Sequence, residues 1–223
     1  MPEPRPSDPP ATGLSGRGLA CRRGERPVFA GLDFLLPPGG ALILRGANGS
    51  GKSSLLRLMA GLTPPAAGML LWDGAPVTDD PARHRARLHF IGHADALKPV
   101  LTVEETLTFW SGMRGGGAPR AALVRFRLGP LAATPCRFLS AGQRRRLALA
   151  RLVASPAPLW LLDEPLTGLD EEAVEDLDAA IAAHRAAGGC VALSTHAPLA
   201  LAGAATLALG DYAPTVAIPA LDA

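Results

Sequence analysis

The most constraining feature of the sequence is a glycine-rich stretch, GANGSGKS, at residues 46–53. It follows the apolar run 41–44 and leads into the amphipathic segment 54–60. A buried strand, a glycine-rich turn and a helix in this order form the context in which the pattern G-x-x-x-x-G-K-[ST] binds phosphate. Glycines allow successive backbone N–H groups to converge on one anion, and the positive end of the following helix points to the same place. The chain is therefore predicted to contain a phosphate-binding loop.

Two side chains at the end of this loop carry specific chemistry. Lys52 is expected to reach the β- and γ-phosphates of a nucleotide, and the Ser53 hydroxyl is expected to ligate Mg²⁺. The alternative is an ordinary glycine-rich turn between a strand and a helix. The chain has only two lysines, Lys52 and Lys98, among 22 basic residues. A lysine at the one position that phosphate binding requires therefore favours the phosphate-binding loop.

Length and composition indicate a globular protein. The 223 residues suit one or two domains, and 48% of them are hydrophobic and 19% charged. The net charge of +2 is too small to favour a nucleic acid as partner. Three widely spaced cysteines, Cys21, Cys136 and Cys190, indicate free thiols in a reducing compartment. We expect the proline-rich residues 1–14 to form a disordered arm, and no apolar run approaches the ~20 residues that span a bilayer.

The order of apolar runs predicts an α/β fold. Strands without polar alternation, which are covered on both faces, are expected at residues 41–44, 88–91, 159–162 and 190–193. Helical periodicity at 171–187 runs through Val174, Leu177, Ile181 and Ala182. Because strands and helices alternate, the sheet is expected to be mostly parallel. Alternating residues from about 19 to 36 predict antiparallel strands that pack beside it.

A helical subdomain is predicted at about 101–155, inserted into this core. Thr102 and Glu105 form a capping-box pattern at the start of its first helix. Leu107, Trp110 and Met113 are expected on one face of that helix. Glycines 115–117 break it, and a second helix is expected at 120–128.

Two adjacent carboxylates, Asp163 and Glu164, follow the apolar strand 159–162. The carboxyl end of a buried strand is where ligands bind in open α/β sheets. Asp163 is therefore expected to hold Mg²⁺ opposite Ser53, through water, and Glu164 to orient or deprotonate an attacking water. A solvated strand end is the alternative, and the phosphate loop upstream favours the catalytic interpretation.

A third motif, LSAGQ at 139–143, precedes the basic segment RRRLALAR at 144–151. Ser140 is expected to cap a helix whose exposed N–H groups form a second anion site. From these residues alone, a basic solvated helix with a good cap is the alternative.

Five motifs in this order resemble those of the ABC (ATP-binding cassette) ATPases. They are the phosphate loop, the LS-x-GQ signature before an arginine-rich helix, a strand ending in Asp-Glu-Pro, the sequence TGLD at 167–170 and the sequence STH at 194–196. The similarity extends over about 19–209. It implies the fold of that family, a P-loop NTPase core with a parallel sheet, an antiparallel β subdomain and an inserted helical subdomain, within one ATP-binding domain at 15–223.

The resemblance implies a role for each matched residue. Two such domains meet head to tail in this family, and each binds ATP and Mg²⁺ through the loop residues Gly46, Ala47, Asn48, Gly49, Ser50, Gly51, Lys52, Ser53 and Ser54. The second copy contributes Ser140, Gly142 and Gln143 to the same γ-phosphate. Glu164 is expected to be the general base, His196 to contact the γ-phosphate, and Asp170 to couple the two sites.

Two positions depart from the family pattern. A glutamine that senses Mg²⁺ is replaced by His93, so any metal contact there falls to an imidazole. No aromatic residue stands where one stacks on adenine, and Arg23 is expected to stack through its guanidinium plane. His84, His89 and His93 suggest a separate metal site as an alternative, without a supporting cysteine or carboxylate pattern.

A closer resemblance is carried by IGHADALKP at 91–99, LSAGQRRRLALARL at 139–152 and STHAPL at 194–199. These stretches are similar to the ATP-binding subunits of bacterial haem exporters in the cytochrome c maturation system. The similarity implies integral membrane subunits as partners, a position on the cytoplasmic face of the cell membrane, and ATP-driven release of a haem-loaded chaperone. Neither nucleic acid nor direct haem binding is expected. The alternatives are export of a drug or lipid, a soluble ABC ATPase acting on nucleic acid or ribosomes, and a phosphotransferase sharing only the phosphate loop.

Overall fold

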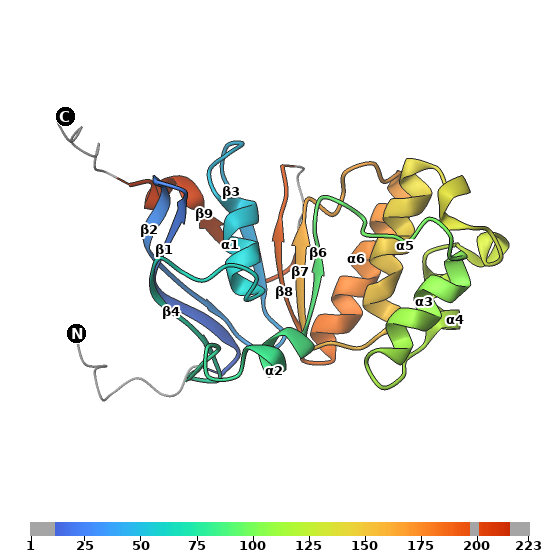
Figure 1. Cartoon of the computed structure of the whole chain (residues 1–223), viewed down its shortest axis with the longest axis horizontal. Coiled ribbons are helices and arrows are strands. Elements are labelled where there is room, and N and C mark those ends of the chain that lie inside the picture. The colour runs from blue at the N-terminus through green and yellow to red at the C-terminus, as the bar shows by residue number, and fades with distance from the viewer. Residues whose placement is uncertain (1–11, 197–200, 215–223) are drawn as a thin grey trace.

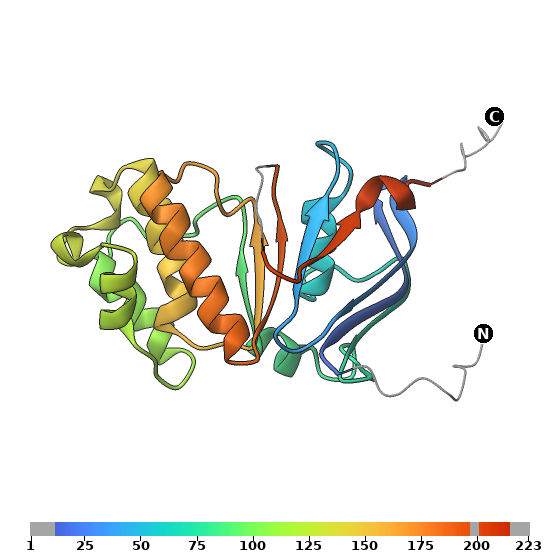
Figure 2. The same cartoon turned by 180° about the vertical axis from the view of Figure 1, so that it is seen from behind.

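The computed structural model describes residues 12–196 and 201–214. Figure 1 shows an antiparallel sheet at one end, a parallel sheet in the middle and a group of helices at the other end. The same arrangement is seen from behind in Figure 2, where the long helix α6 (Glu171–Ala186) lies beside the parallel sheet. The predicted fold, with a parallel sheet, an antiparallel β subdomain and a helical insertion, is confirmed.

The antiparallel sheet has the strand order β2-β1-β4-β5. These strands are β1 (Leu14–Arg23), β2 (Arg26–Leu36), β4 (Ala67–Trp72) and β5 (Ala75–Pro76). The sheet begins earlier than expected, because Leu14, predicted to end the disordered arm, is the first residue of β1 and is fully buried. Residues 1–11 of that arm lie outside the described residues.

The second sheet is parallel throughout and has the order β6-β7-β8-β3-β9. Its strands are β6 (Leu88–Ile91), β7 (Leu159–Asp163), β8 (Cys190–Ser194), β3 (Ala41–Arg45) and β9 (Ala205–Ala208). The four strands expected from apolar runs are all present. Strand β9 is half exposed and, within the described part of the chain, pairs only with β3; it carries no such run and was not predicted. Since all five strands are parallel, their carboxyl ends lie along one edge, the upper edge in Figure 1.

Alternate residues of the parallel strands face two separate cores. Leu159 and Leu161 of β7 pack in one cluster with helix α1 (Lys52–Met59) and the antiparallel sheet. Trp160 and Leu162 point to the other face and pack with helices α5 (Ala141–Ala154) and α6. Every residue of β7 and β8 is buried, which explains the apolar runs without polar alternation.

The predicted helical subdomain contains α3 (Val103–Gly112), α4 (Pro119–Arg125) and α5, and a shorter helix, α2 (Pro81–Ala86), precedes β6. The capping box of α3 is confirmed: the Glu105 N–H donates to Thr102 Oγ1 at 3.1 Å and the Thr102 N–H donates to Glu105 Oε2 at 2.8 Å. Two predicted helix faces were partly wrong. Met113 is the C-cap of α3 and is exposed, unlike Leu107. The face of α6 that packs on the core consists of Ala173, Leu177, Ala180 and Ile181, without Val174 and Ala182. The domain boundaries stay predictions.

Candidate nucleotide-binding site

The glycine-rich loop connects the carboxyl end of β3 to the amino end of α1. Gly51 is the N-cap of α1, and its φ of 106° lies in the left-handed region that side chains disfavour. A Cβ on Gly51 would lie 2.6 Å from Val28 Cγ1. Since no side chain caps this helix, its first N–H groups stay available for a ligand.

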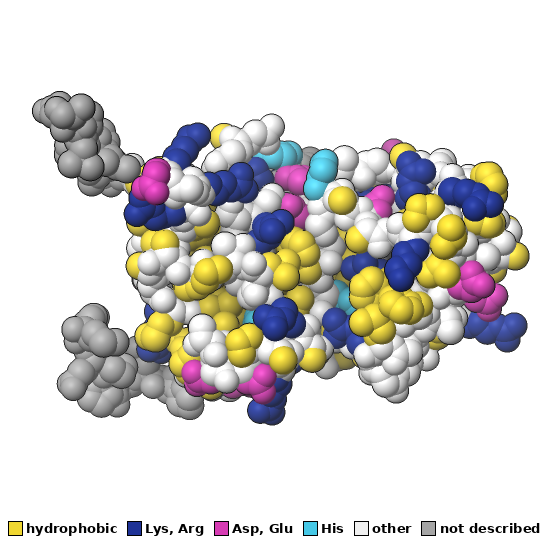
Figure 3. Space-filling model, in the orientation of Figure 1, with side chains coloured by type: hydrophobic (Ala, Val, Ile, Leu, Met, Phe, Trp, Pro, Cys, Tyr) yellow, Lys and Arg dark blue, Asp and Glu magenta, His cyan; other side chains and the backbone are white. Residues whose placement is uncertain are grey.

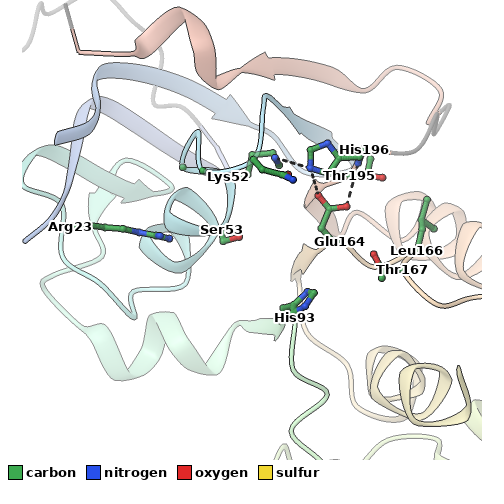
Figure 4. A pocket seen from close by; sticks show the side chains of 12 residues that line it. Arg23, Lys52, Ser53, His93, Glu164, Leu166, Thr167, Thr195 and His196 are labelled. Atoms are coloured by element: carbon green, nitrogen blue, oxygen red, sulfur yellow. Dashed lines mark hydrogen bonds and ion pairs between the residues drawn. The ribbon is translucent and has the colours of Figure 1, made fainter. Parts of the chain in front are cut away.

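Lys52 is buried inside the loop that it follows. Its Nζ donates to the carbonyl oxygens of Gly46 at 2.8 Å and Ala47 at 3.1 Å, and it lies 3.1 Å from Nε2 of His196. An ammonium can only donate, so Nε2 of His196 accepts in this arrangement. The positive charge is thus held at the centre of the loop, directly beside His196 (Figure 4).

Ser194, at the carboxyl end of the neighbouring strand, contacts both acidic residues: the carboxylate of Asp163 and the main chain of Glu164. The Ser194 hydroxyl donates to Asp163 Oδ1 at 2.7 Å and accepts from the Glu164 N–H at 2.9 Å. Glu164 has a φ of 47°, which is uncommon for a residue with a Cβ, and its carboxylate turns toward His196. Its Oε2 accepts from the His196 N–H at 3.3 Å, and its Oε1 lies 3.4 Å from Nε2. Ser194 was not predicted to have this orienting role.

Lys52, Glu164 and His196 line one cavity of about 500 Å³. Its lining, drawn in Figure 4, consists of Arg23, Asn48, Gly49, Gly51, Lys52, Ser53, His93, Glu164, Leu166, Thr167, Thr195 and His196. A neighbouring cavity of about 480 Å³ shares Arg23, Ser53 and His93 with it and adds Asp163. In Figure 3, histidine, acidic and basic side chains gather at the same upper edge of the molecule, where the parallel strands end. The structure thus brings together most of the residues predicted for one half of a nucleotide site.

Four predicted loop residues do not line this cavity. Gly46 and Ala47 take part only through the carbonyls that bind Lys52, and Ser50 lies behind the loop, near Gly46. The Ser54 hydroxyl accepts a hydrogen bond from Nε of Arg23 at 3.0 Å, so it holds the arginine that was predicted to stack on adenine. Their contacts to ATP stay predictions.

The signature residues Ser140, Gly142 and Gln143 and the coupling residue Asp170 lie outside the cavity lining. Ser140 is exposed and caps α5, where its Oγ accepts from the Gln143 N–H at 3.2 Å. Asp170 caps α6 and pairs with Arg146. The hydrogen bond from the Ala173 N–H, followed by the pairing with Arg146, lowers the pKa of the Asp170 carboxyl. One chain therefore does not contain both predicted halves of a phosphate site in one cavity.

Three predicted Mg²⁺ ligands line the neighbouring cavity: Ser53, Asp163 and His93. The first two suit Mg²⁺ better than the third. The Ser53 hydroxyl and the Asp163 carboxylate are oxygen donors, as Mg²⁺ prefers. The imidazole of His93 lines the same cavity, but nitrogen ligands favour transition metals. His93 stays a predicted metal contact.

The alternative of a separate histidine metal site has no geometric support. Nε2 of His84 lies 2.8 Å from the Met59 carbonyl, and Nε2 of His89 donates to the Ser155 carbonyl at 2.7 Å. Burial lowers the pKa of both imidazoles, that of His89 to about 4. Among the described residues, no group of three histidine, cysteine or acidic side chains is arranged to hold a metal ion.

Comparison with known proteins identifies the class of this site. The family model described as ABC transporter matches residues 29–167, and the chain belongs to the ABC transporter family. The chain is 56% identical over 203 residues to the cytochrome c biogenesis ATP-binding export protein CcmA of Rhodospirillum rubrum, covering 90% of this chain and 87% of the relative. The protein of the same name from Paramagnetospirillum magneticum is 54% identical over 212 residues, 92% of this chain and 98% of the relative.

The fold comparison agrees with this family. A solved ATP-binding subunit of an ABC transporter is 27% identical and superimposes with a TM-score of 0.77 over 83% of this chain and 80% of that one. The resemblance to ABC ATPases, and to their cytochrome c biogenesis members, is thereby confirmed. Within the two described ranges, the structure has no helix with the length and hydropathy needed to span a bilayer.

Proposed function

We propose that this chain binds and hydrolyses ATP as the nucleotide-binding subunit of a membrane exporter. The observation that carries the proposal is the convergence of Lys52, Glu164 and His196 on one cavity at the carboxyl edge of the parallel sheet. An ammonium, a carboxylate and an imidazole beside a glycine-rich loop are the groups that phosphoryl transfer to water uses. Membership of the ABC transporter family supports the same function.

The chain's own residues would divide the reaction between them. The γ-phosphate replaces the two carbonyls that now bind Lys52, and the ammonium and the loop N–H groups stabilise its charge. Glu164 accepts a proton from the water that attacks the γ-phosphorus, while the bond to the β-phosphate oxygen breaks and ADP leaves. His196 hydrogen-bonds the transferred phosphoryl group. Bound Mg²⁺ would neutralise phosphate charge, and Ser53 and Asp163 are the residues that would hold it.

A second copy of the chain is part of this proposal. Ser140, Gly142 and Gln143 do not line the cavity of their own chain, and Ser140 is exposed at the amino end of α5. A head-to-tail partner would bring these residues to the γ-phosphate, and Asp170 would lie between the two sites. The requirement for two copies makes hydrolysis depend on dimer closure.

The proposal for the exported material is based on the names of similar proteins. Two proteins named for cytochrome c biogenesis and export are more than half identical to this chain. We infer that the chain docks on integral membrane subunits at the cytoplasmic face of the bacterial membrane, and that its ATP cycle releases a haem-loaded chaperone. In this proposal the membrane subunits handle the haem, and this chain binds only nucleotide.

The test of the catalytic proposal is Glu164→Gln, which keeps the shape of the side chain and removes its basicity. Loss of a general base lowers turnover by about 10²–10⁴-fold. ATP affinity, measured by equilibrium dialysis, should persist while phosphate release collapses. The matched control is Glu175→Gln on the exposed face of α6, which should leave both unchanged. A Glu164→Gln protein that turns over at the normal rate would place the base elsewhere.

The transport proposal needs a separate experiment. The chain is affinity-purified from membranes in mild detergent, the associated subunits are identified, and c-type cytochromes are assayed in a deletion strain. Copurification of membrane subunits together with loss of c-type cytochromes is the expected result. Membrane subunits with normal cytochromes would point to a drug or lipid exporter, and copurified nucleic acid to a soluble ABC ATPase.

A further inference from the structure

Among the described strands, β6 lies at the edge of the parallel sheet, so half of its backbone groups have no strand to pair with. The Leu159 N–H of β7 donates to the Arg87 carbonyl at 3.1 Å. Because backbone groups alternate in direction along a strand, the carbonyls of Leu88 and Phe90 in β6 face away from β7. Unpaired carbonyls at a sheet edge need other partners.

Three arginines of the helical subdomain supply these partners. Arg114, just after α3, donates to the carbonyls of Ala86 and Leu88, the first at 2.6 Å. Arg151 of α5 donates to the Phe90 carbonyl at 3.2 Å, and Arg145 of α5 donates to the Gly92 carbonyl at 2.9 Å. We call this set, Arg114, Arg151 and Arg145, the arginine ladder. Arg145 and Arg151 join helix α5, which follows the signature motif, to the segment that leads to His93, and Arg114 joins the end of α3 to the start of that segment.

Arg145 differs from the other two members because it also contacts the catalytic segment. Its Nη2 donates to the carbonyls of Asp163 at 3.0 Å and Glu164 at 2.8 Å. Its Nη1 lies 3.3 Å from Asp95 Oδ1 in addition to the Gly92 carbonyl. The side chain is almost fully buried. One guanidinium therefore bridges the loop that carries His93 and the segment that carries Glu164.

We propose that Arg145 is a positioning residue for hydrolysis, which fixes the main chain of Glu164 relative to the His93 loop and to the signature helix. The inference rests on the proposed function, because it takes Glu164 as the base. Glu164 has a left-handed backbone conformation, and such a conformation persists only where surrounding contacts hold it. Two of the contacts on this segment come from Arg145, and Ser140 begins the same helix five residues earlier. A displacement of α5 on binding of a second copy is therefore transmitted to the base.

The chemistry of the contact requires arginine. Its planar guanidinium presents five N–H donors in a fixed fork and can bind carbonyls of two segments at once. A lysine at this position would keep the positive charge but would place three donors on a single atom. Arg145→Lys therefore separates a role in geometry from a role in charge.

The experiment compares Arg145→Met, Arg145→Lys and Arg114→Met in the full chain with its membrane partners. Misplacement of a reacting group by about 1 Å can lower turnover by about a hundredfold. Both Arg145 variants should lower kcat by about tenfold to a hundredfold, with ATP affinity changed less than about threefold. Arg114→Met, which removes two hydrogen bonds to the same strand, should leave kcat unchanged. Amide hydrogen exchange should quicken at residues 92–96 and 163–167 only in the Arg145 variants.

The outcomes are decisive in each direction. Equal losses of kcat in Arg145→Met and Arg114→Met, or a fully active Arg145→Lys, would overturn the proposal. If Arg145→Met does not fold, Asp95→Asn weakens the same bridge and should lower kcat several-fold at constant ATP affinity. A normal rate for Asp95→Asn, with normal exchange at 163–167, would also overturn it. Failure of the base assignment is seen separately, as normal turnover in Glu164→Gln.

Discussion

Helices α1 and α5 both begin at a predicted phosphate site, yet their first turns are built differently. Helix α1 starts after Gly51, which offers no side chain, and its first side chain, Lys52, is buried within the loop. Helix α5 starts after Ser140, whose Oγ accepts from the Gln143 N–H, while Gln143 Oε1 accepts from the Ser140 N–H at 2.8 Å. The amino end of α1 is therefore uncapped, and that of α5 is satisfied by its own side chains.

Because of this difference, the amino end of α1 can bind an anion as it stands, whereas the amino end of α5 must first break hydrogen bonds of its capping box. The free N–H groups of α1 and the nearby ammonium can bind an anion without rearrangement. To bind the same anion, the capping box of α5 must exchange at least one of its two hydrogen bonds for a phosphate oxygen. We infer that the loop of α1 provides affinity for nucleotide and that α5 responds to a nucleotide already bound on the partner.

The largest effect is expected when each site is removed in a different copy. Lys52→Ala should abolish nucleotide binding or turnover. Ser140→Arg should abolish turnover, because it places a bulky cation at the exposed amino end of α5. In a mixture of the two variants, each mixed dimer carries one site with both defects and one site with neither. Phosphate release from the mixture should therefore recover to at most one working site per mixed dimer.

The same mixture tests the head-to-tail pairing. Either variant alone should be inactive, and recovery should depend on the ratio in which the two are mixed. If the mixture stays as inactive as either variant alone, each chain completes its own site, and the proposed division of roles between α1 and α5 is wrong. Full activity of Ser140→Arg by itself would show that the amino end of α5 takes no part in ATP hydrolysis.

The parts of the site that were predictable from the sequence depend on local order along the chain. The loop at 46–53 contains its own turn, helix start and lysine, and the structure places them as expected. The segment Asp163-Glu164 follows its strand directly, so its position at the sheet edge followed from the fold. The apolar runs of β7 and β8 predicted burial on both faces for the same reason.

The parts that were missed depend on contacts between distant segments. Arg145 stands in a run of three arginines for which a solvated helix was the alternative interpretation, and only the packing of α5 against β6 and β7 shows that this one is buried. Ser194 belonged to a recognised motif, but its hydrogen bond to Asp163 depends on the pairing of β7 with β8. His84 and His89 were considered only as part of an alternative metal site, because the sequence gives no sign of the backbone carbonyls that they contact.

A smaller effect should separate capping from catalysis. The capping boxes of α3 and α5 are alike, since Thr102 and Ser140 both accept from a backbone N–H three residues later. Removing either hydroxyl, as Thr102→Ala or Ser140→Ala, should cost about 1 kcal/mol of unfolding free energy. Only Ser140→Ala should also lower ATP turnover, because only that hydroxyl is proposed to contact the nucleotide. Denaturant unfolding and phosphate release are measured in both variants. If their ATP turnover is equal, Ser140 acts only as a helix cap.

An effect on stability alone is expected at the other end of α5, where the carbonyl of its C-cap, Ser155, accepts from buried His89. Burial lowers the pKa of His89 from its ordinary 6.5 to about 4, so between these values the unfolded chain binds more protons than the folded one. The contribution of His89 to the free energy of unfolding should therefore be fully present above pH 6.5 and be lost as the pH drops toward 4. His89→Gln keeps a donor for the carbonyl and cannot titrate, so it should flatten this slope. Unfolding free energies from pH 8 to pH 5 measure it. If the unfolding free energy of the variant depends on pH as steeply as that of the unchanged protein, His89 does not cause the pH dependence.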